Sequence, residues 1–156
     1  MEVWLQIRSK VFGILATLAL GISSVVRVKV LDVVDETRVR VLEEEVEREV
    51  FLAGIAYPTG DEKSINDGRW MIETVAKEFF FNMEVLREFQ DNRHVTLYAL
   101  GGESVNGLML RKGYARYSAM GIGSQEAMLE AEKYAKDNRI VIWNSQRELF
   151  RNATQP

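Results

Sequence analysis

The stretch Arg48-Glu49-Val50-Phe51-Leu52-Ala53-Gly54-Ile55-Ala56-Tyr57-Pro58-Thr59 is the most informative part of this chain. Val46, Val50 and Leu52 lie at even spacing, which predicts a strand with one buried face. Glu43-Glu44-Glu45 precedes this strand and predicts a charged turn, so the stretch is expected to form the return strand of a hairpin. Consecutive carboxylates on a strand point to opposite faces. We therefore expect the acidic run to be a solvated hairpin tip and not a calcium site.

The same two-residue period occurs on both sides of this hairpin. Val26, Val28 and Val30 alternate with basic residues, which predicts a half-buried strand. Further strands are predicted at Thr37–Val41, Met83–Phe89, His94–Leu100 and Tyr114–Tyr117.

Helical spacing predicts three helices between and after these strands. The first carries Trp70, Val75 and Phe79 on its buried face, follows a polar connection at 64–68 and ends near Phe81. The second is a short helix over 105–113, which Gly113 ends in a left-handed conformation. The third is N-capped by Ser124. It has Met128, Ala131, Tyr134 and Ala135 on one face, and Ile140–Trp143 closes the core after it.

Short strands with an inserted helix predict an α+β, mostly β fold. We expect an OB-type five-stranded Greek-key barrel with about three helices, preceded by an apolar N-terminal helix. The expected limits are 1–24 for the hydrophobic helix, 25–145 for the barrel domain and 146–156 for a C-terminal tail.

Composition excludes several classes of site. With 156 residues, the chain is long enough to bury one core. Its net charge of −3 does not favour unaided binding to phosphate backbones. The absence of cysteine excludes disulfides and thiolate sites, and a single histidine, His94, excludes a histidine-based zinc site. His94 is expected to be a surface or strand residue.

The N-terminus contains an uncharged, mostly apolar run of about 16 residues from Val11 to Val26, flanked by Arg and Lys. As a helix this run would be about 24 Å long, short for a bilayer core of about 30 Å. Gly13, Thr17 and Gly21 would stack on one helix face, which permits close approach of another helix in lipid. Three interpretations stay open: a membrane anchor, a cleaved secretory signal peptide, and a soluble helix buried on its own domain.

Three segments carry a resemblance to a known family. Leu52, Gly54, Ile55 and Pro58 resemble the Arg-Leu-x-Gly-Ile-Asp-x-Pro-Glu segment of the staphylococcal nuclease-like (thermonuclease) family. The stretch 105–115 is similar to the family's Val-Asn-x-x-Leu-Val-x-x-Gly-x-Ala helix. The closing segment 130–143 is similar to its final helix and terminal Trp, so the resemblance spans 25–143.

The resemblance implies a calcium-dependent phosphodiesterase site whose catalytic side chains are missing here. In the family an Arg binds phosphate, an Asp holds calcium and a Glu is the general base. Phe51, Ala56 and Thr59 stand at these three positions. A second family Arg corresponds to Arg93.

The family's Asp-Gly-Asp-Thr turn corresponds to residues 32–37, which are longer by two residues and lack the Gly. Asp32, Asp35 and Glu36 are the remaining candidates for a cation, although a turn carboxylate is usually only a turn former.

These substitutions predict a pseudoenzyme without cofactor: a membrane-anchored structural or accessory subunit with protein partners in a membrane complex. The expected location is a membrane, with a single-pass N-terminal anchor and the mitochondrial inner membrane among the candidates; secretion after signal cleavage is the alternative. Two other functions stay open. One is a divergent calcium-dependent nuclease, and the other is a module that binds single-stranded nucleic acid, although nucleic acid is not the expected partner.

Overall fold

The computed structural model describes residues 25–58, 60–120, 122 and 125–144. Five strands close into a barrel in the order β1-β2-β3-β6-β5. They are β1 (Val25–Val33), β2 (Arg38–Glu43), β3 (Val46–Leu52), β5 (Phe80–Phe89) and β6 (Asn92–Tyr98). Neighbouring strands are antiparallel except β3 and β6, which pair in parallel. The predicted five-stranded barrel is therefore confirmed.

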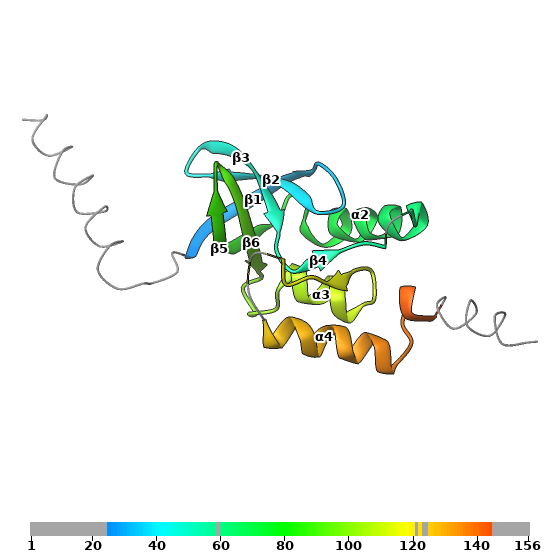
Figure 1. The fold of residues 1–156 in the computed structure, drawn as a ribbon. Coiled ribbons are helices and arrows are strands. Elements are labelled where there is room, and N and C mark those ends of the chain that lie inside the picture. Colours follow the sequence, from blue (N-terminus) through cyan, green and yellow to red (C-terminus); the bar gives the residue numbers. More distant parts are fainter. Residues whose placement is uncertain (1–24, 59, 121, 123–124, 145–156) are drawn as a thin grey trace, which may run out of the picture.

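Three α-helices in the described residues surround this barrel: α2 (Glu62–Ala76), α3 (Val105–Arg111) and α4 (Glu126–Asp137). Figure 1 shows α2 beside the barrel and α3 stacked between the barrel and α4. A separate two-stranded sheet joins β4 (Ile55–Ala56) to β7 (Arg116–Tyr117).

The barrel interior is apolar because inward positions of each strand carry Val, Leu or Met. The helices close the core with side chains that are almost completely buried, among them Ile72 of α2 and Met109 and Leu110 of α3. Burial of each such side chain stabilises the fold by about 1.5–3 kcal/mol. Asn106 of α3 fixes this helix to the barrel, because its side chain bonds the backbone of Ala53, Val95 and Leu97.

Both ends of the first predicted helix, which is α2, were predicted wrongly. It begins at Glu62, because the Asp61 carboxylate accepts hydrogen bonds from the backbone N–H and the hydroxyl of Ser64. It ends at Ala76, and residues 80–81 belong to β5. Its buried stripe is Ser64, Gly68, Ile72 and Ala76. Trp70 and Phe79, predicted to be buried, have more than half of their surface exposed.

Three further predictions are corrected. The predicted last strand forms only at 116–117 and pairs with β4, outside the barrel. Gln125 occupies the N-cap position of α4, and its side chain makes no capping hydrogen bond; Ser124 lies outside the described residues. Tyr134 is nearly half exposed, with the Arg111 guanidinium 4.7 Å from its ring centre. Met128 and Ala135 are buried as predicted.

The acidic hairpin divides into two parts. Glu44 and Glu45 form the turn and are exposed as predicted. Glu43 is not solvated: its side chain is only 15 % exposed and accepts from Arg93 at 2.8 Å and from Arg48 at 3.0 Å. The difference arises because Glu43 is the last residue of β2 and takes an inward position, two residues beyond the buried Val41.

The apolar N-terminal run overlaps the barrel. Its last two residues, Val25 and Val26, are the first residues of β1 and pair with β5. The run left for a separate helix is therefore 11–24. Gly13, Thr17 and Gly21, like the expected tail 146–156, lie outside the described residues. In the described part of the chain no helix is long and apolar enough to cross a membrane.

Candidate functional site

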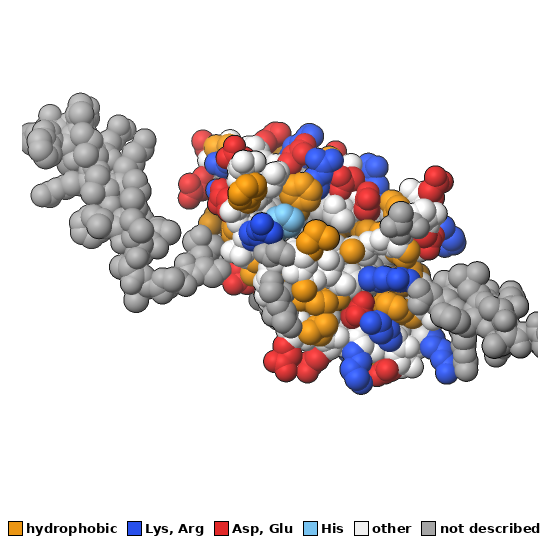
Figure 2. All heavy atoms as spheres, in the orientation of Figure 1, with side chains coloured by type: hydrophobic (Ala, Val, Ile, Leu, Met, Phe, Trp, Pro, Cys, Tyr) orange, Lys and Arg blue, Asp and Glu red, His pale blue; other side chains and the backbone are white. Residues whose placement is uncertain are grey.

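A hollow of about 540 Å³ lies where β3 leaves the barrel. Its walls come from the β1–β2 turn, the end of β3, β4 with the loop to α2, the first turns of α2, β6 and the segment after β7. The lining residues are Glu36, Thr37, Phe51, Leu52, Gly54, Ile55, Ala56, Tyr57, Pro58, Gly60, Ile65, His94, Ser118 and Met120. Figure 2 shows the pale blue side chain of His94, the only histidine, among hydrophobic side chains on this face. We call this hollow the β3–β4 hollow.

Phe51 forms one wall of the β3–β4 hollow. Its ring stacks on the imidazole of His94, with the ring centroids 5.2 Å apart and the planes inclined by 17°. The pair forms because Phe51 of β3 and His94 of β6 are direct neighbours across the parallel strand junction. The guanidinium of Arg38 lies 5.6 Å from the Phe51 ring centre. The residue that the resemblance places at the family's phosphate-binding position is thus part of an aromatic stack.

Ala56, at the resembled calcium position, lines the same hollow from β4, where it pairs with Arg116 of β7. A methyl group cannot coordinate a cation, which binds oxygen ligands. Thr59, at the position of the general base, lies outside the described residues. Gly54 sits between these positions with φ +76, and a Cβ there would lie 2.3 Å from the Met128 sulfur of α4. The positive φ and this close contact both favour Gly at this position.

Of the three candidate cation ligands, only Glu36 lines the hollow. Asp32 faces Lys77 at 3.3 Å. The pKa of Asp32 is lowered by a hydrogen bond from the Val33 backbone and by Lys77. The structure therefore does not bring Asp32 and Glu36 to one wall of this hollow.

Asp35 is committed to the turn itself. It accepts from the backbone N–H groups of Thr37 at 2.9 Å and Arg38 at 2.7 Å, and from the Arg38 side chain at 2.6 Å. Burial raises the pKa of Asp35, but these hydrogen bonds outweigh burial and hold the pKa below its usual value. No group of three or more His, Cys, Asp or Glu side chains within the described ranges is placed to hold a metal ion.

Arg93, the candidate survivor of the second family Arg, does not line the β3–β4 hollow. It closes one end of the barrel, where its guanidinium contacts Glu43 at 2.8 Å and Glu88 at 3.1 Å. Arg48 shares the carboxylate of Glu43. The side chain is half-buried and bound to two carboxylates, so a phosphate would have to displace them.

Sequence reasoning missed Tyr57, which lines the hollow and packs against α2. A Cβ at Gly68 would lie 2.3 Å from the ring carbon Cε1 of Tyr57, so the helix approaches the ring closely. Burial raises the pKa of the Tyr57 hydroxyl, and the carboxylates of Glu36 and Asp35 raise it further. The one signal in the sequence was Gly68, a helix-interior glycine that is costly without a packing reason.

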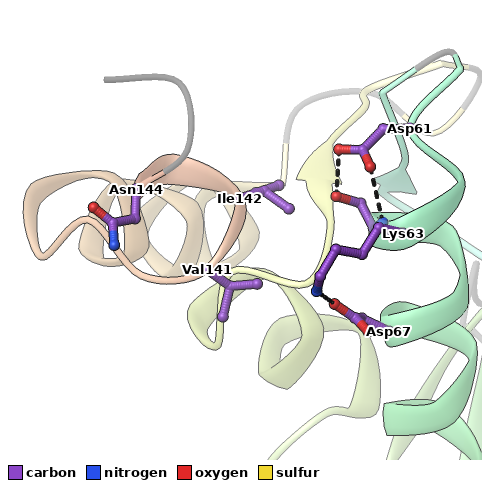
Figure 3. Close-up of a pocket in the computed structure, with 7 residues that line it drawn as sticks. Asp61, Lys63, Asp67, Val141, Ile142 and Asn144 are labelled. Carbon is purple, nitrogen blue, oxygen red and sulfur yellow. Dashed lines mark hydrogen bonds and ion pairs between the residues drawn. The ribbon is translucent and has the colours of Figure 1, made fainter. Parts of the chain in front are cut away.

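A second hollow, of about 380 Å³, lies between the first turn of α2 and residues 141–144 (Figure 3). Its polar groups satisfy each other: Asp61 caps the helix at Ser64, and Lys63 pairs with Asp67. Exposed i, i+4 pairs of this kind contribute about 0.3–0.5 kcal/mol. We assign this hollow to the start of α2 and not to a ligand.

Comparison with known proteins agrees with the observed fold. The family model described as staphylococcal nuclease homologue matches residues 49–145, which is more than half of the chain. The matched range includes Phe51, Ala56 and Arg93, whereas the turn with Asp32, Asp35 and Glu36 precedes it. No curated protein matches the chain at a significant level of similarity.

Proposed function

The chain belongs to the staphylococcal nuclease homologue family, and from this premise we propose that it is a non-catalytic, membrane-tethered domain that acts as an accessory or interaction subunit. One observation carries the non-catalytic part: Phe51 and Ala56 line the β3–β4 hollow at the positions where the family carries its phosphate-binding Arg and calcium-binding Asp. Among the described residues, the lining contains no Lys or Arg, and Glu36 is its only carboxylate.

Energetic estimates support the loss of activity. Removing a single preorganised group that stabilises the transition state costs about 10²–10³ in rate. A metal-assisted hydrolase also needs converging oxygen ligands for its cation and a base for the attacking water. With Phe51 and Ala56 in place, both a cationic group and a ligand are missing, so the combined loss is expected to reach at least about 10⁴.

A cleavage assay with single-stranded DNA and calcium tests this proposal. We expect no calcium-dependent product above the rate with a chelator. The matched variants are Arg93→Ala, which removes the candidate family Arg, and Arg87→Ala, which removes an exposed Arg of the same hairpin. Calcium-dependent cleavage by the purified protein that is lost in Arg93→Ala and kept in Arg87→Ala would establish the divergent-nuclease alternative. Cleavage equal in all three proteins indicates a contaminant.

Binding of single-stranded nucleic acid is supported less well, because two of the basic residues near the β3–β4 hollow, Arg38 and Arg40, are already paired. Arg38 contacts Asp35 and Glu49, and Arg40 also contacts Glu49. Backbone binding depends on cations that can replace counterions of phosphate. Oligonucleotide affinity that falls steeply with rising salt would favour this alternative instead.

Membrane tethering is supported by the apolar run 11–24, with Gly13, Thr17 and Gly21 at four-residue spacing. We expect the full chain to stay with the membrane fraction after carbonate extraction. Leu15→Arg places a charge in the middle of the run and costs about 2.5–3.5 kcal/mol of insertion free energy, so this variant should move to the soluble fraction. Leu129→Arg, on the exposed side of α4, is the control. Complete extraction of the unchanged protein would exclude an anchor.

A further inference from the structure

The β3–β4 hollow has the size and surface of a binding site. Its volume of about 540 Å³ falls in the range of about 300–1,000 Å³ typical of ligand sites. Phe51, Ile55, Pro58 and Met120 make its lining mainly apolar. The hollow is open to solvent, so a small molecule would leave much of its surface wet. In contrast, a side chain of another protein would be shielded from water by the residues that flank it in that protein.

The charges of the described lining disfavour an anionic occupant. Glu36 is the only ionised side chain of the lining, and Asp35 lies near it in the same turn. Burial and, second, the charge of Arg87 lower the pKa of His94, so its imidazole is neutral at pH 7. Arg38 is held by Asp35 at 2.6 Å, and Arg87 pairs with His94 from β5 outside the described lining. A phosphate or carboxylate would therefore meet the Glu36 carboxylate, and no Lys or Arg of the described lining would bind it.

Two features of the rim favour an occupant that carries a Lys or Arg next to the apolar side chain that fills the hollow. The Glu36 carboxylate has no ion pair among the described residues, whereas Asp35 and Glu49 both contact Arg38. Glu36 lines the same hollow as Tyr57, and the charges of Glu36 and Asp35 raise the pKa of the Tyr57 hydroxyl after burial. A Lys or Arg of an occupant could pair with Glu36 without breaking an existing contact.

We propose that the β3–β4 hollow binds a short segment of a partner protein that inserts one large apolar side chain and places a Lys or Arg against Glu36. This inference rests on the proposed function as an interaction domain and names the chemistry of the partner. The apolar side chain contributes most of the affinity, because it removes apolar surface of both partners from water. The exposed ion pair contributes selectivity.

A set of three capped peptides tests the proposal with the full-length protein. The probes are acetyl-Gly-Phe-Arg-Gly-amide, acetyl-Gly-Phe-Glu-Gly-amide and acetyl-Gly-Ala-Arg-Gly-amide. Binding is followed by the NMR shifts of the backbone amides of Ala56, His94 and Ser118. We expect the Phe-Arg peptide to bind about two- to fivefold more tightly than the Phe-Glu peptide, as an exposed ion pair allows. It should bind at least about tenfold more tightly than the Ala-Arg peptide.

Two variants separate the contribution of the Glu36 charge to peptide binding from the contribution of the apolar hollow. Glu36→Gln should make the Phe-Arg and Phe-Glu peptides bind equally, and it should leave the thermal midpoint unchanged because Glu36 has no ion pair among the described residues. Ala56→Leu fills the hollow and should abolish binding of both Phe peptides. Glu103→Gln, on an exposed loop away from the hollow, should bind all peptides as the unchanged protein does.

Several results would overturn the proposal. They are no shift with any peptide, equal binding of the Phe-Arg and Phe-Glu peptides to the unchanged protein, and displacement of the Phe-Arg peptide by thymidine 3′,5′-bisphosphate. If peptide binding fails and calcium-dependent cleavage is also absent, only the partner chemistry is wrong. Calcium-dependent cleavage that requires Arg93 would instead overturn the proposed function itself.

Discussion

The imidazole of His94 stacks on the ring of Phe51 at a centroid distance of 5.2 Å, across the parallel junction of β3 and β6. This contact makes His94 a reporter of position 51, where the resemblance predicts a phosphate-binding Arg in the family. Burial lowers the pKa of His94, and Arg87, its direct neighbour on β5, lowers it further.

We expect Phe51→Arg to lower the pKa of His94 below its value in the unchanged protein. A second guanidinium next to the imidazole disfavours the protonated form. Phe51→Leu removes the stacked ring without adding charge, so it serves as the control and should leave a smaller shift. An NMR pH titration measures this directly, because His94 is the only histidine. A pKa that rises in Phe51→Arg would show that the two side chains are not in contact.

The lowered pKa of His94 also predicts how stability depends on pH. In the unfolded chain His94 takes up a proton near its ordinary pKa of about 6.5, whereas in the folded protein it stays neutral to a lower pH. The unfolded state therefore binds more protons in this interval, and the free energy of unfolding rises with pH there. His94→Gln should show a smaller rise between the folded pKa and 6.5 when urea unfolding is measured at a series of pH values. The prediction would be contradicted if the free energy of unfolding rose equally with pH in His94→Gln and in the unchanged protein.

Arg93 bridges two carboxylates of unequal burial, and this predicts unequal effects of removing them. The Glu43 side chain is 15 % exposed and also holds Arg48, whereas the Glu88 side chain is 49 % exposed. We expect Glu43→Gln to cost about 1–3 kcal/mol of unfolding free energy, because the mostly buried Arg93 and the exposed Arg48 lose their shared partner. Glu88→Gln is the matched variant and should cost less than about 1 kcal/mol. If urea unfolding gave the same loss of unfolding free energy for Glu43→Gln and Glu88→Gln, Arg93 would not be buried with Glu43.

The barrel could be predicted from the sequence because its strands carry apolar residues at every second position. Helix α2 could not be placed in the same way. Its buried stripe starts with Ser64 and Gly68, small residues that carry no hydrophobic signal, while the large Trp70 faces solvent. The sequence pattern therefore predicted the wrong face of α2 to be buried.

The candidate site was predictable only in part. Phe51 and Ala56 follow from their place in a recognisable local motif. His94, Ser118 and Met120 reach the same hollow through the closure of the barrel and the β4–β7 pairing, which no local pattern encodes. For the same reason, the pairing of Glu43 with Arg93, 50 residues further along the chain, was not expected from an acidic turn.

Asn106 is predicted to be one of the most sensitive residues of the fold. Its buried amide donates to the carbonyls of Ala53 at 2.7 Å and Val95 at 3.0 Å, and accepts from the Leu97 N–H at 3.2 Å. Asn106→Ala removes three buried hydrogen bonds and should cost about 2–4 kcal/mol in urea unfolding. Asn66→Ala, at an exposed position of α2, is the control and should stay within about 0.5 kcal/mol. If Asn106→Ala also lost only about 0.5 kcal/mol of unfolding free energy, water would have replaced the hydrogen bonds of the amide.

The β2–β3 turn predicts a stabilising substitution. Glu44 and Glu45 both have positive φ, at 47° and 70°, which defines a two-residue turn that prefers Asn-Gly. An L-residue in this conformation costs about 1–2 kcal/mol, and part of the gain is lost because Gly adds freedom to the unfolded chain. Replacing Glu44-Glu45 by Asn-Gly should therefore raise the free energy of unfolding by about 1 kcal/mol. Replacing the pair by Gln-Gln removes the charges and leaves the conformational cost, so it separates the two contributions. An unfolding midpoint that rises as much with Gln-Gln as with Asn-Gly would assign the effect to repulsion between the carboxylates instead of to the backbone.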